Sequence, residues 1–301
     1  MLVNTITLTT PTLDPIGLCF HPLAALANHS CAPTASITFS GRTLHLRSLA
    51  PLDRATEITI PYIDTTYPTR VRQEELRSRW FFACTCAVCA LAPAAPTDVY
   101  ICTSCGTPTV PDRAPYVCTV CASAQRAPLP GACTDLHALH ASGQFPLRRQ
   151  PLPAAHLAAL QTLLAAGDFA GALKHQLLLH TRVNPVLYGQ PHHPVRVAGG
   201  FVLAALLMEV MRAPGNELAS VGVDWAKAVW AVLAEVEAGV NGSHGNESPF
   251  AKAVRAKQKE VSEELVKAGV TWAKNGRVEG LQDELAKVAK VVDGLVADLK
   301  T

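Results

Sequence analysis

The sequence predicts an α+β protein whose two halves differ in character. In residues 1–125, short β-like runs alternate with prolines and glycines, and nine of the ten cysteines lie there. From about residue 150, apolar residues recur at helical spacing. Nearly half of the 301 residues are apolar, which is enough for a sizeable core and more than one domain. We therefore expect a partial β fold and two cysteine-rich segments, followed by an all-α C-terminal half.

Composition and charge argue against several classes of function. The net charge is +2 and the basic residues are scattered, so we expect no direct nucleic-acid partner. The N-terminal residues lack the basic and apolar regions of a signal peptide. The longest apolar run, residues 197–211, contains Glu209 and is shorter than the ~20 residues of a bilayer span. It is typical of a buried helix, so no membrane partner is expected.

The first sixty residues predict short strands. Residues 6–8 form a β-like run that is followed by prolines. Residues 35–39 and 43–49 alternate apolar and polar side chains around a Ser-Gly-Arg turn at 40–42, which is the pattern of a β-hairpin. Residues 56–60 predict a third strand. These strands are too few to close a domain without partners.

A helix and a linker come next. Thr69 is a candidate N-cap for a helix that runs to about Arg79. Trp80-Phe81-Phe82 then supplies aromatic mass beside the first cysteine cluster. The proline- and alanine-rich residues 91–96 are typical of a linker.

The C-terminal half predicts six helices, separated by glycine- and proline-containing loops at 167–168, 214–215 and 239–245. A stacked array of tetratricopeptide-like helical hairpins is one interpretation, although its consensus is not legible. The predicted helices cover residues 154–166, 168–183, 195–212, 224–238, 249–268 and 278–300.

The cysteine spacing predicts two zinc sites. Cys84, Cys86 and Cys89 offer three thiolates, which leaves tetrahedral zinc one ligand short. Three free, half-buried cysteines are the alternative. The second cluster has two CxxC pairs and resembles a zinc ribbon with four ligands of its own. Its members are Cys102, Cys105, Cys118 and Cys121.

Both zinc sites would be structural, because neither leaves a position for water. Cys19 and Cys133 have no partner at ligand spacing. Metal-ligand spacing in place of a disulfide framework favours a reducing compartment, so we expect an intracellular protein of the cytoplasm or nucleus.

Three short motifs in one order carry a family resemblance. They are Asn28-His29-Ser30-Cys31, the run Glu-Ile-Thr-Ile-Pro-Tyr-Ile-Asp at 57–64, and the aromatic–cysteine segment at 80–89. Together they resemble the C-terminal half of a SET domain followed by its post-SET zinc segment, most closely the SMYD (SET and MYND) branch with its fungal relatives. The similarity covers roughly residues 4–90. The helical half is similar more loosely, through Leu187-Tyr188-Gly189 and His193-Pro194.

This resemblance implies an S-adenosylmethionine-dependent protein-lysine N-methyltransferase. It implies that Tyr62 is the active-site tyrosine, that Asn28 and His29 hold the cofactor through side chain or backbone, and that Phe82 packs on its adenine. Cys31 would be the fourth ligand of the first zinc. From the residues alone, Tyr62 and Phe82 also fit ordinary packing roles, and a lone histidine such as His29 is often a core residue.

The resemblance also implies an arrangement of domains. The C-terminal part of a SET domain would cover 1–82, a post-SET zinc segment 83–92, a zinc ribbon 97–125 and an α-helical domain 150–301. No Gly-x-Gly turn stands upstream of Asn28 and no MYND finger is present. We therefore expect a truncated form with an incomplete cofactor pocket: a gene fragment, an inactive short form, or a half that is completed in trans.

The expected partner is a protein lysine substrate, histone or non-histone, and the helical half could hold a peptide. The alternative function is a catalytically inactive, zinc-stabilised protein-binding scaffold. It requires the cysteines and the helices but not Tyr62.

Overall fold

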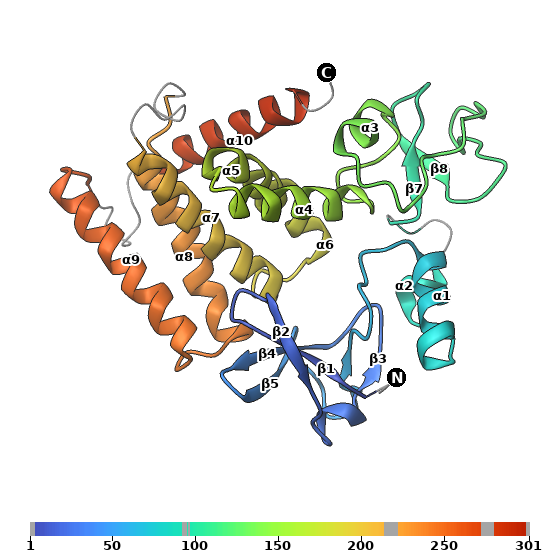
Figure 1. Cartoon of the computed structure of the whole chain (residues 1–301), viewed down its shortest axis with the longest axis horizontal. Coiled ribbons are helices and arrows are strands. Elements are labelled where there is room, and N and C mark those ends of the chain that lie inside the picture. The colour runs from blue at the N-terminus through green and yellow to red at the C-terminus, as the bar shows by residue number, and fades with distance from the viewer. Residues whose placement is uncertain (1–3, 92–94, 96, 214–221, 272–279, 299–301) are drawn as a thin grey trace.

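The computed structural model describes residues 4–91, 95, 97–213, 222–271 and 280–298. It is a mixture of helices and small two-stranded sheets. Figure 1 shows the strands β1 to β5 below the helical half, with helices α1 and α2 beside these strands and strands β7 and β8 above α1, next to α3. The expected division into a β-containing N-terminal half and an all-α C-terminal half is therefore found.

The first strands form two antiparallel hairpins. Strand β1 (Ile6–Thr9) pairs with β2 (Pro15–Cys19), and β4 (Ala35–Ser40) pairs with β5 (Thr43–Ser48). A short 3-10 helix, Ala24–Leu26, follows the first hairpin. Gly41 occupies the turn of the second hairpin with a φ of +58°, a conformation that glycine adopts without steric cost. The hairpin predicted from the alternating pattern is confirmed.

Two very short strands form a parallel pair that periodicity did not predict. Strand β3 (Asn28–His29) lies beside β6 (Thr59–Ile60). The predicted strand at 56–60 is thereby reduced to two residues. The Thr34 hydroxyl donates to the Glu57 carbonyl at 2.9 Å and accepts from the Thr59 amide at 2.8 Å. A side chain therefore satisfies backbone groups that a longer ladder would have used.

Helix α1 (Thr69–Trp80) matches the predicted helix, but its cap differs from the prediction. Thr69 lies inside the helix, and its amide donates to the buried Asp98 carboxylate at 2.6 Å. Asp98 follows the predicted linker, of which residues 92–94 and 96 lie outside the described part of the chain. A carboxylate at a helix N-terminus satisfies an orphan amide and complements the helix dipole.

The second cysteine cluster belongs to a small β unit. After the single-turn helix α2 (Ala87–Ala90), strand β7 (Val99–Ile101) pairs with β8 (Pro108–Pro111). Its core continues into helix α3 (Leu136–Ala141) and the start of α4. This shared core contains Tyr100, Cys102, Val110, Cys118, Leu139, Phe145, Leu152 and Ala155.

The helical half contains the predicted helices with small changes at their ends. Neighbouring helices pack in chain order, α4 on α5, α5 on α7, α7 on α8 and α8 on α9, while α10 contacts α5 and α8. Residues 278, 279, 299 and 300 of the last predicted helix lie outside the described residues. The elements are α4 (Leu152–Ala165), α5 (Phe169–Leu178), a π-helical turn (Leu179–Val183), α6 (Asn184–Leu187), α7 (Pro194–Arg212), α8 (Trp225–Ser243), α9 (Pro249–Lys267) and α10 (Leu281–Asp298).

Helix α7 is long and apolar enough to cross a membrane by length and composition. Here it lies between α5 and α8, and half of its apolar window is buried inside the protein. Leu203 and Leu207 are each 1% exposed. The apolar run therefore forms a core helix of the bundle, as the sequence predicted.

The predicted loop at 239–245 is wrong, because α8 continues to Ser243. A Cβ on Gly239 would lie 2.8 Å from Val197 Cγ2, and one on Gly242 would lie 2.8 Å from His192 ring atoms. Both glycines therefore allow close packing inside a helix, where the sequence pattern suggested an interruption.

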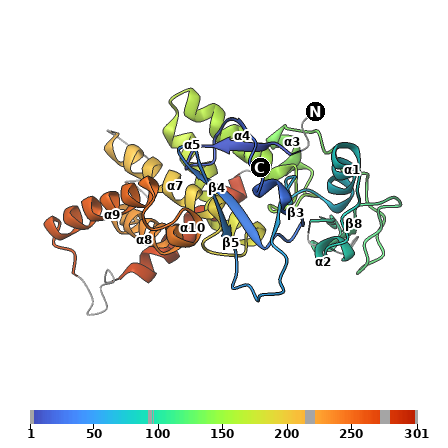
Figure 2. The same cartoon turned by 90° about the horizontal axis from the view of Figure 1, so that it is seen from below.

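The end of α8 joins the helical half to the strands. Thr38 of β4 donates its hydroxyl to the Ser243 carbonyl at 3.0 Å, and His244 Nε2 lies 3.0 Å from the Pro11 carbonyl oxygen. Figure 2 shows β4 and β5 lying across the helices. Helix α8 contacts β5 directly.

Candidate functional site

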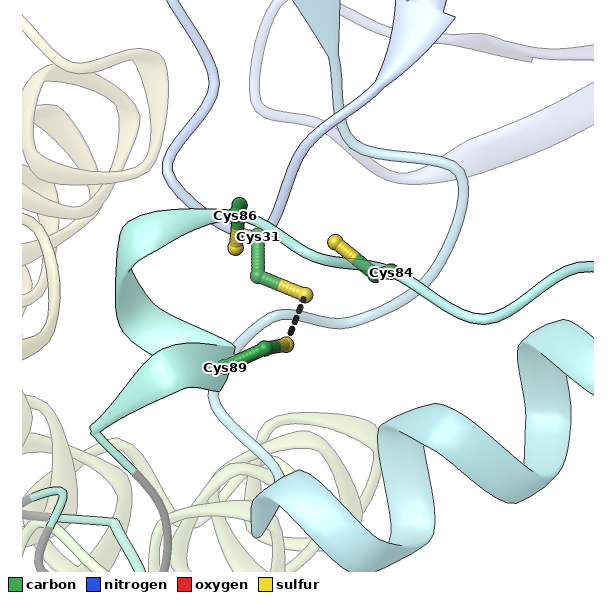
Figure 3. A group of neighbouring side chains, drawn as sticks. All are labelled: Cys31, Cys84, Cys86 and Cys89. Atoms are coloured by element: carbon green, nitrogen blue, oxygen red, sulfur yellow. Dashed lines mark hydrogen bonds between the residues drawn. The ribbon is translucent and has the colours of Figure 1, made fainter.

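The first cysteine cluster draws on two distant segments of chain (Figure 3). Cys31 follows β3, whereas the other three come from α2 and the segment before it. All four sulfurs lie within 4.8 Å of one another, and Cys31 Sγ and Cys89 Sγ are 3.6 Å apart. Tetrahedral zinc with Zn–S bonds of ~2.3 Å places its sulfurs about 3.8 Å apart. Cys31, Cys84, Cys86 and Cys89 therefore fit one zinc ion.

A buried arginine supplies positive charge beside this cluster. The Arg72 side chain is fully buried, and its guanidinium donates to carbonyl and hydroxyl oxygens and to Cys89 Sγ at 3.8 Å. Burial raises the pKa of Cys31, against the lowering effect of the Arg72 charge; the neighbouring Cys89 and Cys84 raise it further. Four thiolates are thus stable here only with compensating cations, which bound zinc and Arg72 would provide.

The second cluster also has the geometry of a zinc site. Cys102 and Cys121 Sγ are 3.6 Å apart, and Cys105 and Cys118 Sγ are 3.7 Å apart. The amides of Val120 and Cys121 point at Cys118 Sγ, each at 3.4 Å. Of these four cysteines, Cys102 and Cys118 are buried and the other two are exposed, and all four sulfurs lie within 4.8 Å of one another. The protein therefore has two cysteine clusters that can each hold zinc.

The remaining cysteines lie apart from the metal clusters. Cys133 packs against the core of the second cluster, and Cys19 ends strand β2. Within the described residues, neither belongs to a group with metal-binding geometry.

The β3–β6 pair brings Tyr62 against His29. The Tyr62 amide donates to His29 Nδ1 at 3.0 Å, and the two rings are 5.4 Å apart. The Tyr62 hydroxyl donates to the Ala27 carbonyl at 2.6 Å. Tyr62 is therefore held at both ends, by its own backbone and by its phenol group.

His29 connects this tyrosine to the first zinc cluster. Since Nδ1 accepts the Tyr62 amide, the neutral ring carries its proton on Nε2, which lies 3.3 Å from Cys31 Sγ. Burial, together with the Arg72 charge, lowers the pKa of His29 to about 4. Hydrogen bonds to metal-ligating side chains from neighbouring residues are a common feature of metal sites, and His29 would supply one to the Cys31 sulfur.

The side chains of Asn28 and His29 are both engaged within the protein. Asn28 Nδ2 donates to Glu57 Oε1 at 2.7 Å, and both ring nitrogens of His29 have protein neighbours. These contacts orient the Tyr62 segment.

Aromatic side chains surround Tyr62. Phe82 meets the Tyr62 ring edge-on at 6.4 Å and lies 6.0 Å from His29, while Trp80 lies 5.7 Å from Tyr62. Phe81, at the end of α1, has a φ of +62° and is 84% exposed. This left-handed residue turns the chain so that Phe82 points back toward Tyr62. The structure thus brings together Asn28, His29, Cys31, Tyr62 and Phe82, all expected from the motifs.

A cavity of about 310 Å³ opens beside Tyr62. One wall consists of β1 together with Ala27 and Trp80, and the other is His193 at the start of α7. His193 stacks on Tyr188 with ring centroids 4.5 Å apart. Sequence reasoning related these two residues to the helical domain and missed that His193 lines the Tyr62 cavity with Tyr188 stacked on it. Burial, and secondarily the Asp64 charge, raises the pKa of Tyr188, so its hydroxyl stays protonated at neutral pH.

Comparison with known proteins supports the family resemblance over about 30% of the chain. The chain is 34% identical over 89 residues to "SET domain and MYND-type zinc finger protein 6" of Schizosaccharomyces pombe, which covers 30% of this chain and 18% of that protein. It is 34% identical over 88 residues to "N-lysine methyltransferase SMYD2" of Gallus gallus, covering 29% and 20%. For "Histone-lysine N-methyltransferase SMYD3" of Mus musculus the identity is 33% over 89 residues, covering 30% and 21%.

The predicted resemblance to SET and MYND domain proteins is confirmed over that stretch. The match spans about a fifth of the length of these relatives. No family model matches the chain.

Proposed function

We propose that this chain carries the tyrosine-bearing half of a SET-type active site and that its protein is an S-adenosylmethionine-dependent protein-lysine N-methyltransferase. The observation that carries the proposal is the fixed position of Tyr62. His29 and Ala27 hold it at the rim of a cavity. His29 also contacts Cys31 of the first zinc cluster, so it lies between Tyr62 and that cluster. The names of three relatives, each a lysine methyltransferase or a SET and MYND protein, support the same activity.

Methyl transfer requires a lysine amine that is neutral and correctly oriented. Bound S-adenosylmethionine would supply an electrophilic methyl group to the lysine lone pair, with the S–CH₃ bond breaking as the N–CH₃ bond forms, and the methylated amine would then release a proton. Because the Tyr62 hydroxyl donates to Ala27, its oxygen is free to accept an N–H of the substrate amine. Burial raises the pKa of Tyr62, which keeps the phenol neutral. Tyr62 would therefore direct the amine without removing its proton.

The residues present fit one side of a cofactor pocket. The half-buried Phe82 ring offers an apolar face, and the backbone of Asn28 and His29 offers hydrogen-bonding groups. The glycine-rich turn that the resemblance implies is not among the residues described. We propose that this 301-residue chain forms an incomplete cofactor pocket and binds S-adenosylmethionine weakly or not at all.

We extend the proposal to the arrangement of domains and the partner. Residues 1–82 would be the C-terminal part of a SET domain, 83–92 its post-SET segment and 97–125 a zinc ribbon, with 150–301 a tetratricopeptide-like helical domain. The substrate would be a lysine of a histone or another protein. Cysteine clusters with metal-binding geometry favour a reducing compartment, so we place the protein in the cytoplasm or nucleus.

The test measures methyl transfer to lysine-containing proteins by the zinc-loaded chain, alone and joined to any upstream in-frame sequence. Transfer should appear in a form that binds the cofactor in calorimetry. Tyr62→Phe should reduce it by about 100-fold or more while leaving cofactor affinity intact. Tyr116→Phe in the zinc ribbon is the matched control. Full activity of Tyr62→Phe would overturn the assignment, and absence of cofactor binding in every form would favour a scaffold.

That second candidate, a catalytically inactive protein-binding scaffold, is supported by exposed apolar side chains near the N-terminus. Ile16, Leu18 and Phe20 alternate along and beyond β2 and are each more than 60% exposed. A grouped apolar surface is typical of protein contacts. Under this reading Tyr62→Phe leaves partner binding unchanged, and Leu18→Ser weakens it.

A further inference from the structure

The two cysteine clusters differ in how far their side chains reach solvent. In the first cluster, Cys31 and Cys84 are buried, the other two cysteines are half-buried, and aromatic side chains pack against the set. In the second cluster, Cys105 and Cys121 are exposed. Thiolates are oxidised where they are accessible. A small oxidant dissolved in water therefore reaches the second cluster and is kept from most of the first.

Hydroxyl groups shield one pair of sulfurs in the second cluster. Thr107 Oγ1 lies 2.9 Å from Cys105 Sγ, and Thr109 Oγ1 lies 3.1 Å from Cys118 Sγ. A thiolate can only accept a hydrogen bond, so both hydroxyls donate. Such bonds draw charge from sulfur and make the thiolate a weaker nucleophile. The pair Cys105 and Cys118, whose sulfurs are 3.7 Å apart, is therefore the less reactive one.

The other pair of sulfurs lacks this shielding. Cys102 Sγ and Cys121 Sγ are 3.6 Å apart, and among the described residues no hydroxyl group contacts either sulfur. Cys121 is exposed and its sulfur accepts a backbone hydrogen bond from Ser123, whereas Cys102 is fully buried. An S–S bond of ~2.05 Å requires the two sulfurs to approach by about 1.5 Å. Cys121 is therefore the thiolate that an oxidant meets first, and Cys102 is a neighbour that can bond to it.

We propose that the second cluster is a site of reversible oxidation by hydrogen peroxide, and that its product is a Cys102–Cys121 disulfide. The Cys121 thiolate attacks one peroxide oxygen: an S–O bond forms, the O–O bond breaks and hydroxide leaves. The Cys102 thiolate then attacks the resulting sulfenic sulfur, and a second hydroxide leaves as the S–S bond forms. The two thiolates together lose two electrons, and the peroxide is reduced to two hydroxide ions.

This oxidation removes two of the four sulfur ligands, so the second cluster would release its zinc. The first cluster would retain zinc, because its sulfurs are less accessible. A thiol reductant restores the thiolates by exchange with the disulfide. Disulfides that form in a reducing compartment are typically transient and often sense redox conditions. The oxidation site acts independently of methyl transfer and of Tyr62.

The test exposes the full, zinc-loaded chain to hydrogen peroxide. A chromogenic chelator follows zinc release relative to the chain without peroxide, and differential alkylation with peptide mapping identifies the disulfides. One of the two zinc ions should leave about tenfold faster or more than the other, together with formation of the Cys102–Cys121 bond. A thiol reductant with added zinc should restore the starting state. Equal release rates of the two ions, or release without this disulfide, overturn the proposal.

Cys133 provides a test of which thiols react, because it packs against the core of the same cluster without belonging to it. Cys133→Ser should respond to peroxide like the unaltered chain, with the same zinc release and the same disulfide. Loss of the Cys102–Cys121 disulfide in this variant would identify Cys133 as a reacting thiol and overturn the assignment.

A second variant tests the shielding by hydroxyl groups. Thr107→Val removes the hydroxyl from Cys105 and should add a Cys105–Cys118 disulfide to the products. Thr119→Val is the matched control, because the exposed Thr119 hydroxyl donates to a backbone carbonyl at 3.1 Å. This control should yield the Cys102–Cys121 disulfide alone. An unchanged product in Thr107→Val overturns the assigned order of reactivity, and the unaltered chain decides the matter if that variant does not fold.

Discussion

Arg72 links helix α1 to the first zinc cluster. Its guanidinium is buried, and of the hydrogen-bond partners described above only the Cys89 sulfur can carry negative charge. A buried cation is stable when an anion compensates it. The same guanidinium also lies near His29, whose pKa it helps to lower. One side chain therefore couples the metal site to the histidine that holds Tyr62.

We expect Arg72→Gln to weaken zinc binding at the first cluster and to destabilise the protein by about 3 kcal/mol, because it leaves the thiolates without their buried counter-charge. Zinc content and the rate of zinc loss to a chelator measure the effect. Arg70→Gln on the same helix is the control, since Arg70 and its partner Glu74 are mostly exposed. Equal zinc retention in the two variants would contradict this role.

Phe81 gives a second prediction for a single residue. Its left-handed conformation is one that glycine adopts readily at a helix C-terminus. Phe81→Gly should therefore increase the free energy of unfolding by about 0.5–1 kcal/mol. Arg79→Gly inside the same helix should decrease it by about 1 kcal/mol. Chemical denaturation of both variants measures this, and destabilisation by Phe81→Gly would show that its exposed ring makes a contact needed for folding.

At the scale of elements, sequence periodicity predicted the helices well because each packs along one apolar face. It failed where the signal was not local. The cap of α1 comes from Asp98, and the short strands β3 and β6 pair although Asn28 and Thr59 are 31 positions apart. Gly239 was interpreted as part of a loop because glycine often interrupts a helix. Its role in close packing depends on Val197 of another helix, which the local sequence does not reveal. Local patterns could not reveal partners that only the folded chain brings together.

The junction between α8 and the strands yields a pH dependence. Burial lowers the pKa of His244 from 6.5 to about 4, with the charges of Arg47 and His45 adding to the effect and the Pro11 hydrogen bond opposing it. The unfolded chain therefore binds the proton first. The contribution of His244 to stability is complete above pH 6.5 and is lost progressively as the pH falls toward 4.

His244→Gln should reduce this dependence, because glutamine keeps a donor for the Pro11 carbonyl and does not titrate. Between about pH 7 and about pH 4.5, wild type should lose more stability than the variant, by at most about 3 kcal/mol. Chemical denaturation at the two pH values measures the difference, in which the titration of the zinc ligands cancels. Parallel losses in the two proteins would exclude His244 as the source.

At the scale of the whole molecule, the two halves have different kinds of core. Cys31 and Cys84 are themselves core residues of the first cluster, and Cys102 and Cys118 are core residues of the second. The helical half instead buries leucine, valine and tryptophan side chains. The sequence predicted the ligands of both clusters, because CxxC spacing is local and Cys31 lies in a recognisable motif. The cavity at Tyr62 was not predictable, since its walls come from segments far apart in the chain.

This difference predicts that zinc removal unfolds one half and spares the other. Without metal, the clusters lose the bonds that join their segments, and small cores of this kind rarely persist. Chelation should remove two zinc ions per chain and expose the amides of residues 28–89 and 97–125 to hydrogen exchange. The start of α4 should also lose protection, because Leu152 and Ala155 pack on the zinc ribbon, whereas α7 and α8 should stay protected.

Cys105→Ser should release one zinc ion and reduce hydrogen-exchange protection only in residues 97–125 and the start of α4, while Cys133→Ser should keep both ions. Loss of protection in α7 and α8 on chelation would mean instead that the helical half depends on the zinc-bound half for its stability.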